Sequence, residues 1–390
     1  MSIERKAMTP LPGCFWLWTL LLFAAIATQI AAVPYTTSVD FSGYTNANTV
    51  SGDKSLLSIA HANISDILVV ARNDGLVAFV DAVNLKPIVN SASSMSRHTK
   101  AVRNVRVATF NGVEYAATVS EDYNMIIWQV TTATPVSTRN LDGSILYDAC
   151  WNGANLFVVS GNGNVFKLNI TNGATISTAG IGVGIYSVAC NGGEVAAGAY
   201  NGTIYIYNAG TMALRTSFPT GVYYPTGLYN VPSLKQVFSS GNVDSYMHIT
   251  SENGTTINTL WGASPRTTGI SPSLDPTKVW FTGDGKAIRY DMTTNLSSYT
   301  ADFGMDASYT GSFVFGLVER IRPTFTVFGV SSTSVYVFNA TVPDNSLGVI
   351  PYTQRNSAIS LNIHPSSPEL ACYNGDSMSN VNGYTIFLSA

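Results

Sequence analysis

The chain has 390 residues, a formal net charge of −3 and only 11% charged residues, although 46% of its residues are hydrophobic. An average soluble protein has about 25% charged residues. Ser, Thr, Asn, Gly and Tyr must therefore supply much of the polar surface, as in many extracellular β proteins. The small net charge excludes a general attraction to nucleic acid or to anionic membranes.

The first 32 residues have the layout of a secretory signal peptide. A weakly basic start with Arg5 and Lys6 precedes an uninterrupted apolar run over 14–27, and small residues then allow cleavage after Ala27 or Ala32. The segment 14–33 is also long enough to span a bilayer as an uncleaved signal anchor. We therefore expect a signal peptide over 1–32, or an anchor over 14–33, and a protein that is secreted or displayed at the cell surface.

One short unit recurs eight times after the signal. Each copy has a turn rich in Asn, Asp, Gly and Ser, followed by six residues of which the second and fourth are usually apolar. This alternation predicts a strand with one buried face and one face that tolerates any residue, and Asn-Gly or Asp-Gly turns supply the positive φ of tight hairpins. The copies lie at 73–81, 122–130, 162–170, 200–208, 243–251, 284–292, 332–340 and 381–389.

Further strands surround each copy. Apolar segments such as 145–151 and 156–160 precede the third copy, and a Thr- and Ser-rich segment, 174–178, follows it. Four short strands in every ~40 residues are typical of propeller blades. We predict an all-β protein, a single β-propeller over 33–390 with four-stranded antiparallel blades. The copies favour eight blades, or seven if the fifth or seventh copy is a chance match.

The two ends of the mature chain fit a closed ring. The sequence stops after the third strand of the eighth unit, and an extended segment, 35–44, precedes the first unit. We expect this N-terminal strand to complete the last blade, because a free sheet edge is prone to aggregation.

The repeats resemble those of WD-type and quinoprotein-like propellers, most closely at 73–81 (NDGLVAFVD) and 161–173 (GNGNVFKLNITNG). The Trp-Asp dipeptide of WD repeats is absent, with Trp128-Gln129 the nearest match, and the upstream Gly-His pair is absent too. The resemblance therefore implies the fold and assigns no functional residue.

No motif in the sequence assigns catalysis, a metal or a cofactor. His-Glu-x-x-His, Cys-x-x-Cys, Gly-x-Ser-x-Gly and phosphate-binding Gly-Lys-Ser/Thr sequences do not occur. Quinone-dependent propellers carry a Trp motif in most blades, which this chain lacks. Ser120, Asp122, Asn124 and Trp128 match the sialidase box only loosely, because the spacing is one residue too long and the Gly is missing.

A basic loop and three aromatic residues are the candidate binding residues. A run of positive residues that ends at Arg106 lies between the first and second units. This run either contacts an anionic partner or is simply solvated. The aromatic residues fall in other inter-blade loops on the same predicted face, where they either bind a partner, including a sugar, or pack internally. The candidates are Arg97, His98, Lys100, Arg103, Tyr223, Tyr224 and Trp261.

Cysteines and glycosylation sequons add further expectations. Without Cys14 in the signal, an odd number of cysteines remains, which allows one disulfide with a spare thiol or three buried thiols: Cys150, Cys190 and Cys372. In a eukaryotic secretory pathway, Asn-x-Ser/Thr sequons are acceptors for glycan when they lie in surface turns. The candidates are Asn63, Asn169, Asn201, Asn253, Asn295 and Asn339.

Three functions fit these observations. The first is an exported, non-catalytic propeller that binds an extracellular protein or glycan, or serves as a scaffold, through its inter-blade loops. The second is a secreted propeller hydrolase, lyase or quinone-type enzyme with its site at the central channel. The third is a structural subunit of an extracellular filament or coat. Each places the protein at a membrane only if the signal remains uncleaved.

Overall fold

The computed structural model describes part of the chain. The described residues are 35–40, 56–62, 64–65, 67–72, 74–81, 88, 97–241, 246–261, 269–272, 277–283, 286–302, 316–320, 326–330, 334–339, 346–351, 360–363, 370–374 and 382–387. The expected signal segment lies outside them. Within the described part of the chain, no helix has the length and apolar character needed to cross a membrane.

The described strands form a series of antiparallel sheets, in which strands adjacent in sequence are also paired in space. In the first half of the chain, the sheets consist of β2 (Leu56–Ala62), β3 (Ile67–Arg72) and β4 (Val77–Asp81); β5 (Val102–Phe110), β6 (Val113–Ser120), β7 (Asn124–Gln129) and β8 (Thr134–Asn140); β9 (Leu146–Asn152), β10 (Asn155–Ser160), β11 (Asn164–Asn169) and β12 (Thr175–Gly180); and β13 (Ile185–Asn191), β14 (Glu194–Ala199), β15 (Thr203–Asn208) and β16 (Leu214–Pro219).

The second half repeats this arrangement. A single 3₁₀ turn, η1 (Pro232–Leu234), joins the first two strands of its first sheet. The sheets consist of β17 (Pro225–Val231), β18 (Gln236–Gly241), β19 (Tyr246–Ser251) and β20 (Thr256–Trp261); β21 (Gly269–Pro272), β22 (Lys278–Gly283), β23 (Lys286–Asp291) and β24 (Leu296–Asp302); β25 (Gly316–Arg320), β26 (Thr326–Val330), β27 (Ser334–Asn339) and β28 (Ser346–Pro351); and β29 (Ser360–Ile363), β30 (Leu370–Asn374), β31 (Asn382–Phe387) and β1 (Tyr35–Asp40).

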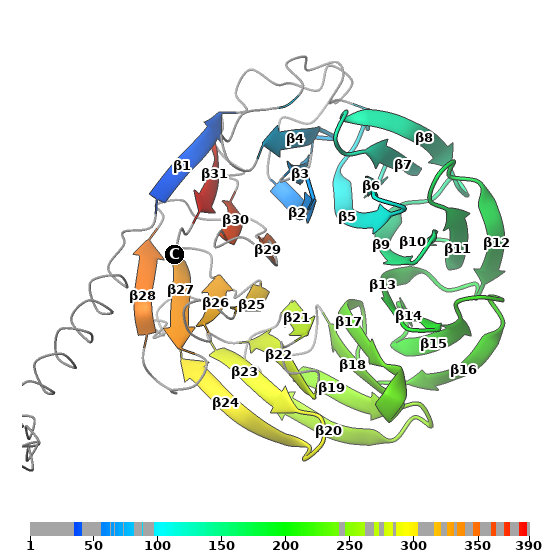
Figure 1. The fold of residues 1–390 in the computed structure, drawn as a ribbon. Coiled ribbons are helices and arrows are strands. Elements are labelled where there is room, and N and C mark those ends of the chain that lie inside the picture. Colours follow the sequence, from blue (N-terminus) through cyan, green and yellow to red (C-terminus); the bar gives the residue numbers. More distant parts are fainter. Residues whose placement is uncertain are drawn as a thin grey trace, which may run out of the picture.

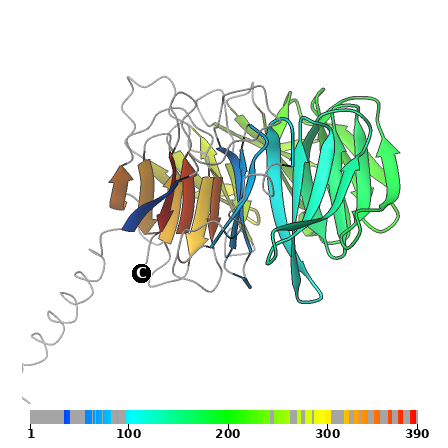
Figure 2. The same ribbon diagram turned by 90° about the horizontal axis from the view of Figure 1, so that it is seen from above.

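The sheets are arranged about a common centre, with the first strand of each sheet innermost and the last strand outermost (Figure 1). Seen from the side, they lie in one layer (Figure 2). The expected all-β, propeller-like fold of mostly four-stranded antiparallel sheets is thus confirmed. The N-terminal strand β1 pairs with the C-terminal strand β31, with Tyr35 opposite Phe387 and Asp40 opposite Asn382.

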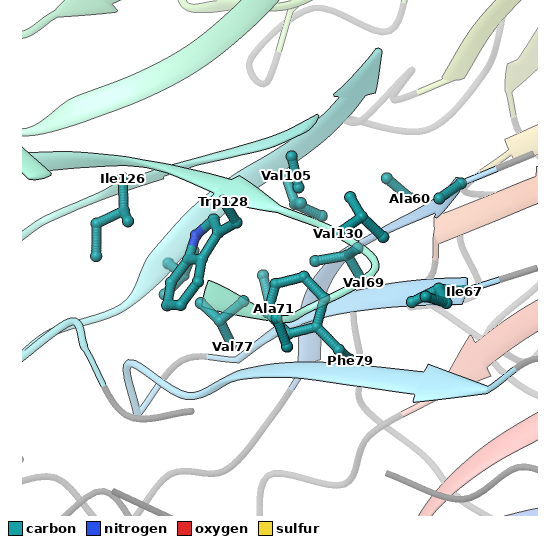
Figure 3. Packing of buried hydrophobic residues seen from close by; sticks show 14 residues of the cluster. Ala60, Ile67, Val69, Ala71, Val77, Phe79, Val105, Ile126, Trp128 and Val130 are labelled. Carbon is teal, nitrogen blue, oxygen red and sulfur yellow. The ribbon is translucent and has the colours of Figure 1, made fainter. Parts of the chain in front are cut away.

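The core consists of apolar layers between consecutive sheets. Between the β2–β4 and β5–β8 sheets, Phe79 and Trp128 are buried with their ring centroids 5.4 Å apart. They lie among Val69, Val77 and Ile126 in the same layer (Figure 3). Each such large side chain stabilises the fold by about 1.5–3 kcal/mol through loss of apolar surface from water.

The prediction that each third strand buries only one face is wrong where the structure describes its side chains, although the second face does hold residues of many kinds. The positions between the alternating apolar residues are buried at Ala78, Ile127 and Lys167, and they are half-buried at Tyr205, His248 and Arg289. Both faces of a sheet are covered because a neighbouring sheet packs on each. Lys167 is tolerated there because its Nζ donates a hydrogen bond to the Gly210 carbonyl, 2.5 Å away in the next sheet. In the outermost strands β8 and β12, by contrast, every residue is exposed or half-buried.

A disulfide joins two neighbouring sheets. Cys150 in β9 and Cys190 in β13 form it, with their Cα atoms 5.7 Å apart and 40 residues apart in sequence. The sequence allowed either one disulfide or three buried thiols, and the structure contains a disulfide. Cys372 belongs to β30, and its side chain is outside the described part.

Candidate functional site

The first strands of five successive sheets share a β-bulge at their second residue. The strand register shifts around this residue in β2, β5, β9, β13 and β17. A bulge leaves one residue out of the ladder and re-aims its side chain, which is a common device near functional sites. The residues left out are Leu57, Arg103, Tyr147, Tyr186 and Thr226.

Two of these bulge residues belong to a group of tyrosines, which we call the tyrosine cluster: Tyr147, Tyr186, Tyr200 and Tyr224. The ring centroids of Tyr147 and Tyr186 are 4.3 Å apart, those of Tyr186 and Tyr224 are 5.3 Å apart, and those of Tyr200 and Tyr224 are 4.2 Å apart. The residues come from three consecutive sheets or from the loops that lead into them. The cluster therefore extends across the sheet ends where the inner strands begin.

The hydroxyl groups of Tyr186 and Tyr224 stay protonated at neutral pH. Burial, followed by a hydrogen bond with Tyr147, raises the pKa of Tyr186 to about 12. A hydrogen bond with Tyr200, followed by burial, raises the pKa of Tyr224 to about 12. A neutral phenol can both donate and accept a hydrogen bond. The cluster thus combines aromatic surface with polar groups of both kinds.

Part of this aromatic surface is open to solvent. Tyr200 is 41% exposed, and Tyr223, next to Tyr224 in the chain, is 55% exposed. Tyr224 itself has a left-handed backbone with φ of 51°. Bulky residues rarely adopt this conformation, which costs about 1 kcal/mol or more. Strained residues of this kind collect at functional sites, and here one holds a ring in an exposed cluster.

The basic loop adjoins the tyrosine cluster, with Arg97 and Lys100 both exposed. Arg103 pairs with Glu121, and their side chains are 44% and 27% exposed. The guanidinium of Arg103 also lies close enough to act on the pKa of Tyr186, which it lowers against the stronger effects of burial and Tyr147. Three of the four cations predicted from this loop therefore lie at the surface.

A second contact brings the loop onto an aromatic ring. The Lys100 Nζ lies 5.0 Å from the ring centroid of Tyr123, within the range of a cation–π interaction. Tyr123 is in the turn between β6 and β7, and its φ is 72°. This is the second tyrosine on the same side of the sheets that has a left-handed backbone.

The fourth predicted cation, His98, lies in the interior instead of at the surface. Its side chain is fully buried, with Nδ1 3.1 Å from both carboxylate oxygens of Asp122 and Nε2 2.8 Å from Thr118 Oγ1. A carboxylate only accepts, so Nδ1 carries the hydrogen. Trp128 Nε1 also donates to Thr118 Oγ1, at 3.0 Å. His98 is thus part of an internal network, which the sequence could not show because its partners are 20 or more residues away.

The same network explains the loose sialidase-like match. Burial alone would raise the pKa of Asp122, but hydrogen bonds and the charge of His98, with backbone N–H groups of Thr99 and Asn124, lower it to about 2. Asp122 and Trp128 therefore serve this network, and Ser120 Oγ donates to the Lys100 carbonyl. These side chains hold the loop to the turn rather than converging on a ligand.

Polar groups on the inner strands are also used between sheets. Ser58 donates to Asn104, whose amide nitrogen donates to Asp148 at 2.6 Å. Asp148 further accepts from the Val188 N–H at 3.1 Å and from Arg106 at 3.1 Å. This chain links four consecutive sheets. Among the residues that the structure describes, no group of three or more His, Cys, Asp or Glu is placed to hold a metal ion.

The remaining predicted residues have varied locations. Trp261 ends β20, but its side chain is outside the described part, as are Asn63 and the side chain of Asn339. The described sequons all lie in turns or at strand ends: Asn169 at the end of β11, Asn201 between β14 and β15, Asn253 between β19 and β20, and Asn295 between β23 and β24.

The sequence did not single out Tyr147, Tyr186 or Tyr200 as site residues. A signal existed for the first two, because each follows an apolar residue at the start of an inner strand, at matching places in successive repeats. The bulge that gives this position its significance depends on the pairing register, which the repeat pattern alone does not give.

Comparison with known proteins gives the fold only. No family model and no curated protein sequence matches the chain. Among solved structures, it is similar to the computationally designed Ika8 protein, with a TM-score of 0.68 and 12% sequence identity over 87% of this chain and 98% of the designed one. At such low identity, the likeness shows a shared fold and carries no information on function.

Proposed function

We propose that this protein is an exported, eight-bladed β-propeller, closed by its N-terminal strand, that binds an extracellular partner through the tyrosine cluster and the adjoining basic loop. The partner is a protein or a glycan, and the propeller acts as a non-catalytic binding or scaffolding module. The single observation that carries the binding role is the partly exposed tyrosine cluster across three consecutive sheets.

Inter-sheet contacts support the ring and the number of blades. The innermost strands contact one another in the order β2, β5, β9, β13, β17, β21, β25 and β29, and β29 in turn contacts β2. The pairing of β1 with β31 supplies a fourth strand to the sheet that contains β29. The sheet that contains β29 thus includes strands from both the N-terminal and the C-terminal part of the described chain.

The disulfide supports export. Bonds such as Cys150–Cys190 persist in oxidising compartments and are rare in a reducing cytosol. The expected signal over 1–32 and the low content of charged residues agree with this location.

The composition of the surface supports binding. Tyr and Arg are enriched among the residues that dominate the energy of protein interfaces, because they offer large contact areas with polar ends. Arg97, Lys100 and Arg103 lie at the surface beside the cluster, with Glu121 as the acidic partner of one of them. This balance of charge favours a partner with anionic groups.

Photo-crosslinking on the surface of the producing cell tests the proposal. A photoreactive side chain is placed at position 223, and a matched control carries it at 176, where Ile176 on the outermost strand β12 is 52% exposed against 55% for Tyr223. We expect one discrete adduct from position 223 and none from position 176. Replacing Tyr200 with Ala should weaken formation of the adduct roughly thirtyfold, the effect of losing a 2 kcal/mol interface residue.

Two results would refute the proposal. One is retention of the tagged protein in the cytosol with residues 1–32 intact, which would exclude export. The other is equal crosslinking from positions 223 and 176, which would show that the tyrosine cluster has no special role. Identification of the adduct as protein or glycan by mass spectrometry then decides between the two classes of partner.

A further inference from the structure

Two of the sequons are the same tripeptide, Asn-Gly-Thr, but they lie at opposite ends of neighbouring sheets. Asn201 lies in the turn between the second and third strands of its sheet, and Asn253 lies in the turn between the third and fourth strands of the next. In an antiparallel sheet, consecutive turns lie at opposite ends of the strands. The same potential glycan acceptor, an Asn side chain in Asn-Gly-Thr, is therefore present at both ends of the sheets.

The local geometry of the two tripeptides is nearly the same. Asn201 Oδ1 accepts the Thr203 N–H at 3.1 Å, and Asn253 Oδ1 accepts the Thr255 N–H at 3.0 Å. The intervening glycines have φ of 80° and 84°. Both asparagines are exposed. Asn253 Oδ1 also accepts a hydrogen bond from Ser251 Oγ, and the two sequons differ further in their surroundings.

The surroundings of Asn201 are the tyrosine cluster itself. Tyr200 directly precedes it, and the carbonyl of Tyr200 accepts the Tyr224 N–H at 3.3 Å. The next residue, Gly202, has its carbonyl 2.8 Å from the Thr220 N–H. The turn that contains Asn201 thus packs directly against segment 220–224, which carries the exposed ring of Tyr223.

Asn253 lies far from this cluster along its own sheet. Tyr224 immediately precedes the first strand, β17, and the turn with Asn253 is at the end of the sheet where β17 finishes. Strands of this length separate the two ends by about 20 Å. An oligosaccharide on Asn253 therefore begins at the other end of the sheet.

We propose that Asn201 is an N-glycan acceptor whose glycan covers the tyrosine cluster, so that the form able to bind the partner is the form without glycan at this position. The transfer forms a bond from Asn201 Nδ2 to C1 of an oligosaccharide supplied by a lipid-pyrophosphate donor. The bond from C1 to the pyrophosphate breaks, and the carrier leaves with the amide proton. This inference depends on the export proposed above.

Tyrosine nitration of the secreted protein from an N-glycosylating host tests the inference. Peptide mapping gives the occupancy of both sequons, and mass spectrometry gives the nitration rate of Tyr200 and Tyr223. The variant Thr203→Ala removes the first sequon but keeps Asn201 and its backbone hydrogen bond, and Thr255→Ala is the matched control. We expect glycan at both sites in the wild type, and several-fold faster nitration of the two tyrosines in Thr203→Ala only.

Tyr115, which is at the opposite end of the β5–β8 sheet, serves as an internal reference for the nitration rate. Glycan at Asn253 but not at Asn201 would overturn this inference while leaving export intact. Glycan at both sites with equal nitration in the wild type and Thr203→Ala would overturn the covering role. Absence of glycan at both sites in a protein found only inside the cell would overturn the export proposal as well. Equal melting temperatures of the variants exclude misfolding as the cause of faster nitration.

Discussion

The turn between β6 and β7 and the turn between β10 and β11 occupy the same place in successive sheets, yet they use opposite residues where the backbone is left-handed. Gly163 has φ of 82° in the second turn, and Tyr123 has φ of 72° in the first. A Cβ on Gly163 would lie 2.5 Å from the Val183 carbonyl oxygen and 2.7 Å from the Val183 nitrogen. Packing therefore dictates glycine in one turn, whereas the other turn accepts a strained tyrosine.

The two turns also differ in which segment supplies the carboxylate that hydrogen-bonds the turn to the preceding loop. In the β5–β8 sheet, the turn supplies the carboxylate, because Asp122 receives His98 and Thr99 from the loop. In the β9–β12 sheet, the loop supplies it, because Asp142 accepts from Ser160 at 2.6 Å and from Asn164 at 2.8 Å. The carboxylate that links loop and turn can thus belong to either segment. Its function is to fix the loops at the end where the tyrosine cluster lies.

The largest expected effect is at the turn that packing dictates. Gly163→Ala places a Cβ against backbone atoms that cannot move aside, and adds the strain of a left-handed alanine. We expect the free energy of unfolding to fall by about 3 kcal/mol, measured by denaturant titration. Gly112→Ala is the control, since φ is 77° there but nothing lies within 4 Å of the added Cβ. Equal losses in both variants would mean that backbone strain alone explains the effect.

A smaller effect is expected for Asp122→Asn. This change gives the turn between β6 and β7 the residue that the turn between β10 and β11 has at the matching place, Asn162. The buried carboxylate accepts hydrogen bonds from His98 and two backbone N–H groups, and loss of its charge should destabilise the protein by about 2 kcal/mol. Thermal unfolding at neutral pH measures this. An unchanged melting temperature would show that an amide replaces the carboxylate without loss.

The pH dependence of the stability of the wild type and of Asp122→Asn sharpens the comparison. The pKa of Asp122 is lowered from 3.8 to about 2, so its ionisation contributes stability that is present above about pH 4 and is lost as the pH falls to about 2. The wild type should lose about 2 kcal/mol over this interval in excess of the loss in Asp122→Asn. Parallel stability curves for the two proteins between pH 4 and pH 2 would contradict the assigned pKa.

The smallest effect is expected at the strained tyrosine. Tyr123→Gly gives the first turn the glycine of its neighbours, which removes left-handed strain but loses the Lys100 contact and makes the unfolded chain more flexible. We expect a net gain of about 0.5 kcal/mol, seen as a slightly higher midpoint of chemical denaturation. A clear loss of stability would show that the ring holds the turn in place.

Much of the fold followed from local patterns. Alternation of apolar residues and Asn-Gly or Asp-Gly turns predicted the third strand of every sheet, and the all-β, propeller-like arrangement is confirmed. The segment 35–44 was predicted as a strand, and its part Tyr35–Asp40 pairs with β31. The sequence was less informative about burial, since it did not show that positions such as Lys167 are covered by a second sheet.

Less of the candidate site followed from the sequence. Arg97, Lys100, Arg103, Tyr223 and Tyr224 lie at or near one surface, whereas His98 is buried. Charge and aromatic character can be read from single residues, but the direction of a side chain depends on its partners. For His98 these are Thr118 and Asp122, which approach only when the sheet has formed.

By itself, then, the sequence determined the strands, the turns, their repetition and the expectation of export, because each depends on residues within a few positions of one another. Only the tertiary structure decided the pairing of Cys150 with Cys190, the internal role of His98 and the assembly of four tyrosines from three sheets. These contacts join residues some 20 to 40 positions apart. Their geometry is set by the packing of one sheet on the next and by the bulges that re-aim side chains, and the pattern of apolar residues does not reveal either of them.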